Sequence, residues 1–465
     1  MKKDTMFSRR EVLALGGALG LSATVPGLLR PARAVAGLVP DPAERRYDAV
    51  VQVFLIGASS QLDTFDPKPG SSSNAFPTID LGFGDQDRKA VRVTTFLRRI
   101  ADVVGDGKGA VRFASLRSMH HATGAHAPAQ DMMASFWSSP VGAAYPALPV
   151  VMNRYLEGAP GPLGLPSVVL SDPLGYGAND ARGSILQPAL EVVAETDPAA
   201  AMRLPVGVDV ARATRRRDLL SLVSRAFTAS RPDVATKGWA DGAEQAHAMA
   251  VKGAAAKAFD LTGKALVAGS DARLQRRLTL ARELVLAGVP YVALGAPGHD
   301  MHTDLKARLT GRWQQELDPG IAGLCSDLAA SGKRVLVVVG GEFGRTPTSV
   351  SGGRDGRDHW AGAFSWGLLS INQPDFVSTA IGDTGPDGTW TEKKLVDPIS
   401  PSAVGGLLYR VLGFPMKSET RVPLADGRLA LPVDGYQATT DFEVTDRSTP
   451  ITTPRLMRRL FQSIV

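Results

Sequence analysis

The chain has 465 residues, of which 44% are hydrophobic and 21% are charged, and it contains one cysteine. A chain of this length can bury a large core, and a single cysteine excludes an intrachain disulfide, so stability must come from ordinary packing. The net charge is +6, but the basic residues are not gathered into one long tract. The composition therefore does not indicate nucleic-acid binding.

The first 36 residues have the features of an export signal. Arg9 and Arg10 precede an apolar, Gly/Ala-rich run from Val12 to Leu29, and small-residue sites of the A-x-A kind end at Ala34 and Ala36. Paired arginines before such a run are typical of the twin-arginine route. Residues 1–36 are therefore predicted to be a signal peptide for the twin-arginine translocase, and the mature protein is expected to be periplasmic or secreted.

The alternative for this segment is an uncleaved membrane anchor. Glycines and Pro26 interrupt the apolar run, which is barely long enough to cross a bilayer, so cleavage is favoured. No second apolar run approaches transmembrane length, and no stable membrane span is expected after cleavage. Removing the signal takes away a net charge of +4, which leaves about +2 on the mature protein.

From residue 47 onward, apolar runs alternate with helical patterns. Continuous apolar runs ended by Gly, Ser or Asp are typical of buried strands in a parallel sheet. They predict strands at Tyr47–Ile56, Val111–Leu116, Leu165–Leu170, Val289–Leu294, Arg334–Val339 and Ala363–Leu369. Helical patterns cover approximately residues 209–286, 313–330 and 401–412.

This alternation predicts an α/β fold, a three-layer sandwich around a mainly parallel central sheet. Residues 37–465 are expected to form a single domain with a helical insertion near residues 195–270. In such sheets ligands bind beyond the carboxyl ends of the strands. Side chains that follow different predicted strands are therefore expected to converge on one edge.

Six of the seven histidines lie in three short segments that also hold a carboxylate or a hydroxyl. The segments are Ser118–His126, His299–His302 and Asp358–His359. Histidine is the commonest metal-ligating side chain, and it is also suited to acid–base chemistry near neutral pH. Their position after or beside predicted strands indicates a functional site.

A metal site at this edge would take Asp, Glu and His ligands from separate strand ends and leave a position open for substrate. Asp300 and His302 are two residues apart, so in an extended segment their side chains point the same way. Arg345, three residues after Glu342, could bind an anionic group or orient Glu342. The candidate ligands are Asp63 or Asp66, Asp300, His302, Glu342, Asp358 and His359.

Structural roles remain open for several of these residues. Glu342 could be an exposed loop carboxylate, and Asp66, which precedes a proline, could start a turn. His120 and His121 are equally well explained as a hydrogen-bonded pair that orders a loop. His126 is farther from any partner and could be structural.

The motifs GASSQLDTFDPKPG, RSMHHATGAHAPAQ, GHDMHTD, VVVGGEFGRTP and GRDHW occur in this order along the chain. In these motifs the chain resembles an exported bacterial family named domain of unknown function 1501, which is placed near the alkaline phosphatase/sulfatase superfamily. The resemblance covers roughly Asp48 to Leu412, and EFGRT followed by DHW is its most specific part. It implies an alkaline phosphatase-like sandwich, with one or two metals and a nucleophile at the carboxyl edge of the sheet.

The resemblance also implies roles for particular residues. Asp63 matches the ligand that follows the first strand, and Asp300 and His302 match the aspartate–histidine pair of one metal. Glu342 stands where a second acidic ligand occurs, and His359 matches the late histidine.

The sequence departs from the superfamily pattern at the nucleophile. The Cys/Ser-x-Pro-x-Arg motif of sulfatases is absent, and Cys325 lies in a predicted helix far from every motif. A formylglycine sulfatase is therefore not expected. Ser118 is the best remaining nucleophile candidate, because it follows a predicted strand and lies near His120, although a serine needs an activating base or metal.

The resulting hypothesis is an exported metal-dependent hydrolase acting on a phosphate or sulfate ester, either a small molecule or a polymer. Ser118 and Arg345 would take part in catalysis, and the cofactor would be a divalent zinc, calcium or manganese ion. The alternative is a non-catalytic exported protein on the same scaffold, which uses a metal for stability or binds a cell-surface polymer.

Overall fold

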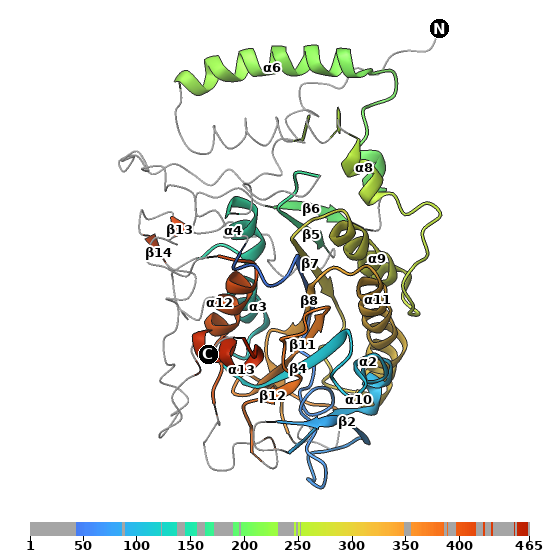
Figure 1. Ribbon diagram of the computed structural model, residues 1–465, viewed down its shortest axis with the longest axis vertical. Coiled ribbons are helices and arrows are strands. Elements are labelled where there is room, and N and C mark those ends of the chain that lie inside the picture. The colour runs from blue at the N-terminus through green and yellow to red at the C-terminus, as the bar shows by residue number, and fades with distance from the viewer. Residues whose placement is uncertain are drawn as a thin grey trace. The chain divides into compact units, whose positions relative to one another are not determined.

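A mainly parallel sheet lies at the centre of the computed structural model (Figure 1). Among the described residues, its eight strands in spatial order are Thr379–Ile381 (β12), Val111–Met119 (β4), Phe364–Ile371 (β11), Val335–Gly341 (β8), Ala49–Leu55 (β1), Tyr291–Ala296 (β7), Ser167–Ser171 (β5) and Leu190–Val193 (β6). In this sheet β11 runs antiparallel to both of its neighbours, and every other pairing is parallel. The expected α/β class with a mainly parallel sheet is confirmed.

The structure describes most of the chain beyond the predicted signal. The described residues are 43–85, 89–121, 123–136, 145–155, 163–171, 189–194, 197–230, 246–247, 250–251, 253–347, 355–385, 388, 397–414, 422–423, 429–430, 451 and 453–463. Residues 38–465 belong to one unit. The predicted signal peptide, residues 1–36, lies outside the described residues. No helix in the described part is both long and apolar enough to cross a membrane.

The alternation of side chains along β1 divides the core into two apolar layers. Ala49, Val51, Val53 and Leu55 face one hydrophobic cluster, whereas Val50 and Phe54 face the other. Successive side chains of a strand point to opposite faces, and a strand covered on both faces reads as one continuous apolar run. All seven residues of β1 are buried.

Helices cover both faces of the sheet (Figure 1). One cluster is formed with Arg98–Val104 (α2), Ala272–Leu286 (α9), Leu305–Leu309 (α10), Thr310–Leu317 (the π-helix η2) and Asp318–Ala330 (α11). The other is formed with His126–Ser135 (α3), Leu148–Tyr155 (α4), Pro401–Val411 (α12) and Thr453–Leu460 (α13). The remaining elements are Thr78–Gly84 (β2), Ala90–Thr94 (β3), Thr95–Leu97 (η1), Pro198–Ala201 (α5), Val210–Ser230 (α6), Ala254–Phe259 (α8), Gly344–Arg345 (β9), His359–Trp360 (β10), Val422–Pro423 (β13) and Leu429–Ala430 (β14).

The six strands predicted from apolar runs are all present, with boundaries shifted by a few residues. β4 ends at Met119 rather than at Leu116, because it pairs with β11 as far as Met119 and with β12 at Leu116. The helical pattern over 209–286 contains α6, α8 and α9. Short strands such as β6 and β12 have too few residues to show a pattern of their own.

The carboxyl ends of β1, β4, β7 and β8 lie at one edge of the sheet, as their parallel pairing requires. Because β11 is antiparallel, its first residue, Phe364, lies at that same edge. The segments that follow β4, β7 and β8 and the segment that precedes β11 can therefore meet. These are the segments that hold six of the seven histidines.

The contact between Gly340 in β8 and Trp366 in β11 gives a test of this packing. A Cβ added at Gly340 would lie 2.1 Å from Trp366 Cδ1, and Trp366 is fully buried. We expect Gly340→Ala to destabilise the protein by about 1–3 kcal/mol, because the indole must move in a close-packed core.

The matched control is Gly311→Ala in η2, where a Cβ would meet nothing within 4 Å. This change should be neutral, or stabilising by up to about 1 kcal/mol, because alanine favours helix. Both free energies of unfolding can be measured by urea denaturation. Equal stability of the two variants would contradict the packing described for β8 and β11.

Candidate metal centre

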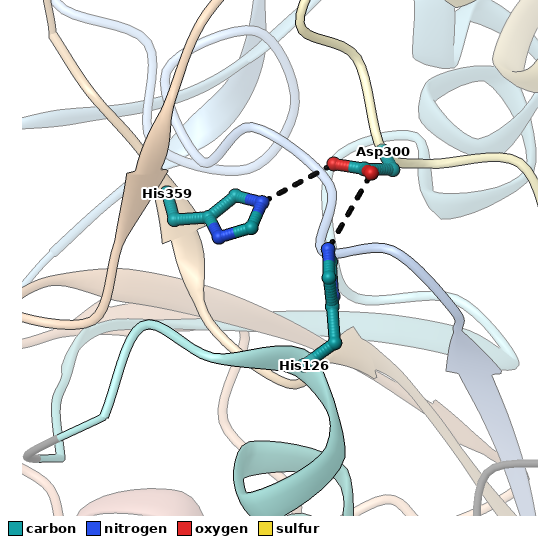
Figure 2. Close-up of side chains that lie close together, drawn as sticks. All are labelled: His126, Asp300 and His359. Carbon is teal, nitrogen blue, oxygen red and sulfur yellow. Dashed lines mark hydrogen bonds and ion pairs between the residues drawn. The ribbon is translucent and has the colours of Figure 1, made fainter.

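Three histidines and one aspartate from three chain segments meet at the carboxyl edge of the sheet. His126 is the first residue of α3, Asp300 and His302 follow β7, and His359 lies in β10 just before β11. In Figure 2, His126 and His359 approach the carboxylate of Asp300 from two sides. One ligand atom from each of these three residues lies within 4.8 Å of the other two.

His302 brings a fourth ligand atom to the cluster. Its Nε2 lies 3.0 Å from Asp300 Oδ1 and 3.0 Å from His359 Nε2. His359 Nε2 is 3.3 Å from the same Asp300 oxygen. His126 Nε2 is 3.5 Å from the other oxygen, Oδ2. Asp300 is thus the centre of the cluster.

A main-chain hydrogen bond fixes the tautomer of His359, and an ion-pair contact lies at Nδ1 of His302. His359 Nδ1 donates to the main-chain carbonyl of Gly124 at 2.7 Å, and His302 Nδ1 lies 2.8 Å from Asp358 Oδ1. The carbonyl oxygen accepts, so Nδ1 of His359 carries the proton. Nε2 of the neutral His359 ring then presents a lone pair toward His302 Nε2 and Asp300.

Glu342 fixes His126 in the same way. Its Oε1 accepts hydrogen bonds from His126 Nδ1 at 2.8 Å, from the main-chain N of Gly57 at 2.9 Å and from Gln130 Nε2 at 3.1 Å. This hydrogen bond to buried Glu342 raises the pKa of His126. Among the described residues, Nε2 of His126 has no hydrogen-bond partner.

Arg345 holds Asp300 in its ionised form. Burial opposes the ionisation of Asp300, but the hydrogen bond and charge of Arg345 outweigh it and lower the pKa of the carboxyl to about 2. Arg345 is fully buried, and its Nη2 donates to Asp300 Oδ1 at 2.5 Å. Its other donors bind the carbonyls of Ala58, Arg357 and Gly57. The guanidinium predicted to bind a substrate anion therefore binds the protein itself.

Asp63 does not reach the cluster. Both of its carboxylate oxygens accept from Arg357, with Nε at 2.7 Å and Nη2 at 3.1 Å, and both side chains are buried. Asp66 is also elsewhere, in an ion pair with Lys68 and a hydrogen bond from Thr384. Of the predicted ligands, the structure brings together Asp300, His302 and His359 directly, and Glu342 and Asp358 through their histidine partners.

Ser118, the predicted nucleophile, lies inside β4 and has no exposed surface. Its Oγ donates to the main-chain carbonyl of Asp397. Because β4 continues past Leu116, Ser118 is a strand residue facing Gly382 rather than part of the loop that leads to His126. The structure does not place this hydroxyl at the cluster.

The remaining histidines of the three segments are core residues. Burial lowers the pKa of His121 to about 4 and that of His299 to about 3, so both are neutral at pH 7. His121 Nε2 donates to the main-chain carbonyl of Glu342 and thereby supports the cluster indirectly. The residue that sequence reasoning undervalued is His126. Its signal was a histidine at the start of a helix, seven residues beyond the end of a strand.

The buried Asp63–Arg357 pair provides a test of the scaffold around the site. Asp63→Ala leaves the Arg357 charge buried and unpaired, and we expect a loss of about 3–5 kcal/mol in the free energy of unfolding. Asp63→Ala combined with Arg357→Met should recover much of this loss. Asp80→Ala breaks an exposed pair with Arg92 and should cost at most about 1 kcal/mol.

Denaturant titration of the four proteins measures this comparison. If Asp63→Ala is no more harmful than Asp80→Ala, the buried pair described above is contradicted.

Comparison with known proteins identifies a family for this chain. The family model described as "Protein of unknown function (DUF1501)" matches residues 47–369, a range that includes every residue of the cluster. No curated protein matches the chain. The match confirms the resemblance carried by the GASSQLDTFDPKPG, EFGRT and DHW motifs. Since it spans well over half of the sequence, the chain belongs to the DUF1501 family.

Proposed function

We propose that this protein is an exported metal-dependent hydrolase that acts on a phosphate or sulfate ester. The observation that carries the proposal is the convergence of His126, Asp300, His302 and His359, in which each histidine Nδ1 lies within 2.8 Å of an oxygen atom. Metal-ligating histidines usually donate their other ring N–H to a carboxylate or carbonyl, which orients the ring and fixes the tautomer.

The spacing of the ligand atoms fits a small divalent ion. Bonds of about 2.0–2.1 Å in a tetrahedron place neighbouring ligand atoms about 3.3 Å apart. The atoms His302 Nε2, His359 Nε2 and Asp300 Oδ1 are separated by 3.0, 3.0 and 3.3 Å. Three lone-pair-bearing atoms at these distances repel one another unless a cation or a shared proton lies between them.

The donor set narrows the choice of metal. Calcium and magnesium prefer all-oxygen sites, whereas imidazole nitrogen suits zinc and other first-row metals. Of the three ions considered, three nitrogens and one carboxylate oxygen therefore favour zinc over manganese and calcium.

The exposure of the cluster suggests a catalytic rather than a structural ion. The side chains of His126, Asp300, His302 and His359 are 31%, 47%, 39% and 27% exposed. Structural zinc sites are closed, whereas catalytic sites keep an open position. When bound, the ion would supply Lewis-acid stabilisation of the ester oxygen and an acidified water, so no serine nucleophile is needed.

The protein's own residues orient this chemistry. Arg345 keeps Asp300 ionised, Asp358 and Glu342 direct the ring nitrogens of His302 and His126, and the surrounding loops come from four strands of one sheet. The mainly parallel sheet with its site at the carboxyl edge supports an alkaline phosphatase-like fold. The paired arginines before the apolar N-terminal run support twin-arginine export to the periplasm or beyond.

Metal content is the first test. Purified mature protein should bind about one equivalent of zinc or manganese, and His302→Ala and His359→Ala should lose most of it. His247→Ala, in a helical segment outside the three motif segments, should not change it. Elemental analysis after dialysis measures the stoichiometry, and less than about half an equivalent in the wild-type protein would overturn the metal centre.

Asp358 should act on the metal through His302. Asp358→Ala removes the carboxylate that lies 2.8 Å from His302 Nδ1, and we expect metal affinity to fall about 10–100-fold. Asp304→Asn is the control, because it removes the same charge two residues from His302 while asparagine tolerates the positive φ there, and among the described residues the Asp304 side chain bonds only Thr303. Competition with a chromogenic chelator gives the affinities, and equal values for the two variants would show that Asp358 does not position His302.

Hydrolysis of aryl phosphate and aryl sulfate esters tests the reaction. The metal-loaded wild type should act on at least one class, and His302→Ala should lose about 100-fold or more in kcat/KM, because the ion stabilises the transition state. If wild type and His302→Ala give the same background rate while the wild type still binds metal, the hydrolase proposal is wrong. The alternative, a non-catalytic metal-binding or polymer-binding protein, is then favoured.

A further inference from the structure

An anionic ester needs a positive group that the protein has not already used. Arg345, which the sequence suggested, has its Nε, Nη1 and Nη2 bound to main-chain carbonyls and to Asp300, and it has no exposed surface. Arg357 is likewise held by Asp63. Neither guanidinium can turn toward a ligand without breaking the scaffold.

Arg308 is placed differently. It lies in α10, six residues after His302, and its side chain is exposed. Nη1 donates to the main-chain carbonyl of Asp300 at 3.1 Å. Among the described residues, no other hydrogen bond or ion pair of this exposed side chain is found, so Nε and Nη2 are available to a ligand.

The local backbone explains why Arg308 returns to Asp300. Asp304 has a positive φ of 54° and starts α10, so the chain turns sharply between His302 and the helix. Arg308 N donates to the carbonyl of Asp304, one helical turn earlier. This turn brings a residue eight positions later in sequence against the main chain of a predicted metal ligand.

The remaining donors have the right shape for a tetrahedral oxyanion. A guanidinium presents a planar fork that binds two oxygens of phosphate or sulfate at once. The anchoring bond through Nη1 also reduces the entropy lost when the side chain binds a ligand. A positive charge at the exposed rim of Asp300 would attract an anion toward the open side of the cluster.

A cavity of about 500 Å³ adjoins the same helix. It is lined in part by Lys306, Thr310, Gln315 and Asp355. Asp304 and Gly311 also line it, and they are four residues before and three residues after Arg308, so they are its neighbours on the helix surface. The cavity therefore lies along the segment that carries Arg308.

We infer that Arg308 is the residue that binds the anionic group of the substrate, and that the cavity along the same helical segment receives the attached organic group. This inference rests on the proposed function, because it uses the metal centre as the second partner of the anion. It assigns substrate binding to a residue outside the motifs that define the metal site.

Anion binding, rather than turnover, tests the inference. The probes are inorganic phosphate and inorganic sulfate, titrated calorimetrically into the zinc-loaded mature protein after free metal has been removed. Arg308→Ala should raise the Kd of the bound anion about tenfold or more, because a charge-assisted hydrogen bond is lost. Arg308→Lys should recover part of this loss, since it keeps the charge but not the planar fork.

Two controls separate substrate binding from structural effects. Lys333→Ala removes one positive charge from the segment before β8, at the opposite edge of the sheet, and should leave the Kd unchanged. Zinc affinity of Arg308→Ala should stay within about twofold of wild type, since the anchoring bond reaches only a main-chain carbonyl.

The outcomes are distinguishable. An unchanged anion Kd in Arg308→Ala, or a wild type that binds zinc but neither anion, overturns the inference and leaves the metal centre intact. A parallel loss of zinc affinity in Arg308→Ala also overturns it, because Arg308 would then only hold Asp300 in place. A wild type that binds no metal overturns both proposals.

Discussion

The ion pair between Asp300 and Arg345 connects the segments from which the site is built. Arg345 follows β8, and it binds carbonyls in the turn after β1 and in the segment before β11 as well as the carboxylate after β7. Taking a guanidinium fully out of water is costly, and only a complete set of acceptors offsets that cost. The four segments must therefore adopt these positions together. Asp300 is fixed by the same network, and the three histidines pack around it.

Much of this arrangement could be predicted from the sequence, because buried parallel strands are continuous apolar runs. The runs that end before His299 and Glu342 located two strand ends, and the spacing of Asp300 and His302 placed both side chains on one side. The direction of β11 could not be predicted in this way. An apolar run does not reveal the direction of its strand in the sheet, and only the pairing with β4 and β8 shows that β11 runs antiparallel. That reversal brings His359 to the site.

Asp63 and Ser118 were predicted at the site but lie elsewhere, and the two wrong predictions have the same physical cause. Asp63 follows the first strand, as a metal ligand would, but Arg357, 294 residues away, neutralises it. Ser118 precedes two histidines, but its neighbour Met119 still pairs with Phe364 of β11 and with Ile399, so Ser118 stays inside the sheet. In both cases a long-range partner satisfies the polar group, and no local pattern reveals that partner. His126 is the opposite case. It is far in sequence from the other candidate ligands, but α3 and the hydrogen bond to Glu342 hold it at the cluster.

Three oxygens that face the histidine Nδ1 atoms bear on how the proposed site would acquire a metal. Gly124, Glu342 and Asp358 lie in different segments, and each places an oxygen within 2.8 Å of a histidine Nδ1. The ligand rings are therefore oriented by the folded scaffold, whose two apolar layers are large enough to be stable without a metal. This differs from small zinc domains, in which metal binding and folding are one event. A preformed site selects its ion by geometry and by which ions are available where it folds.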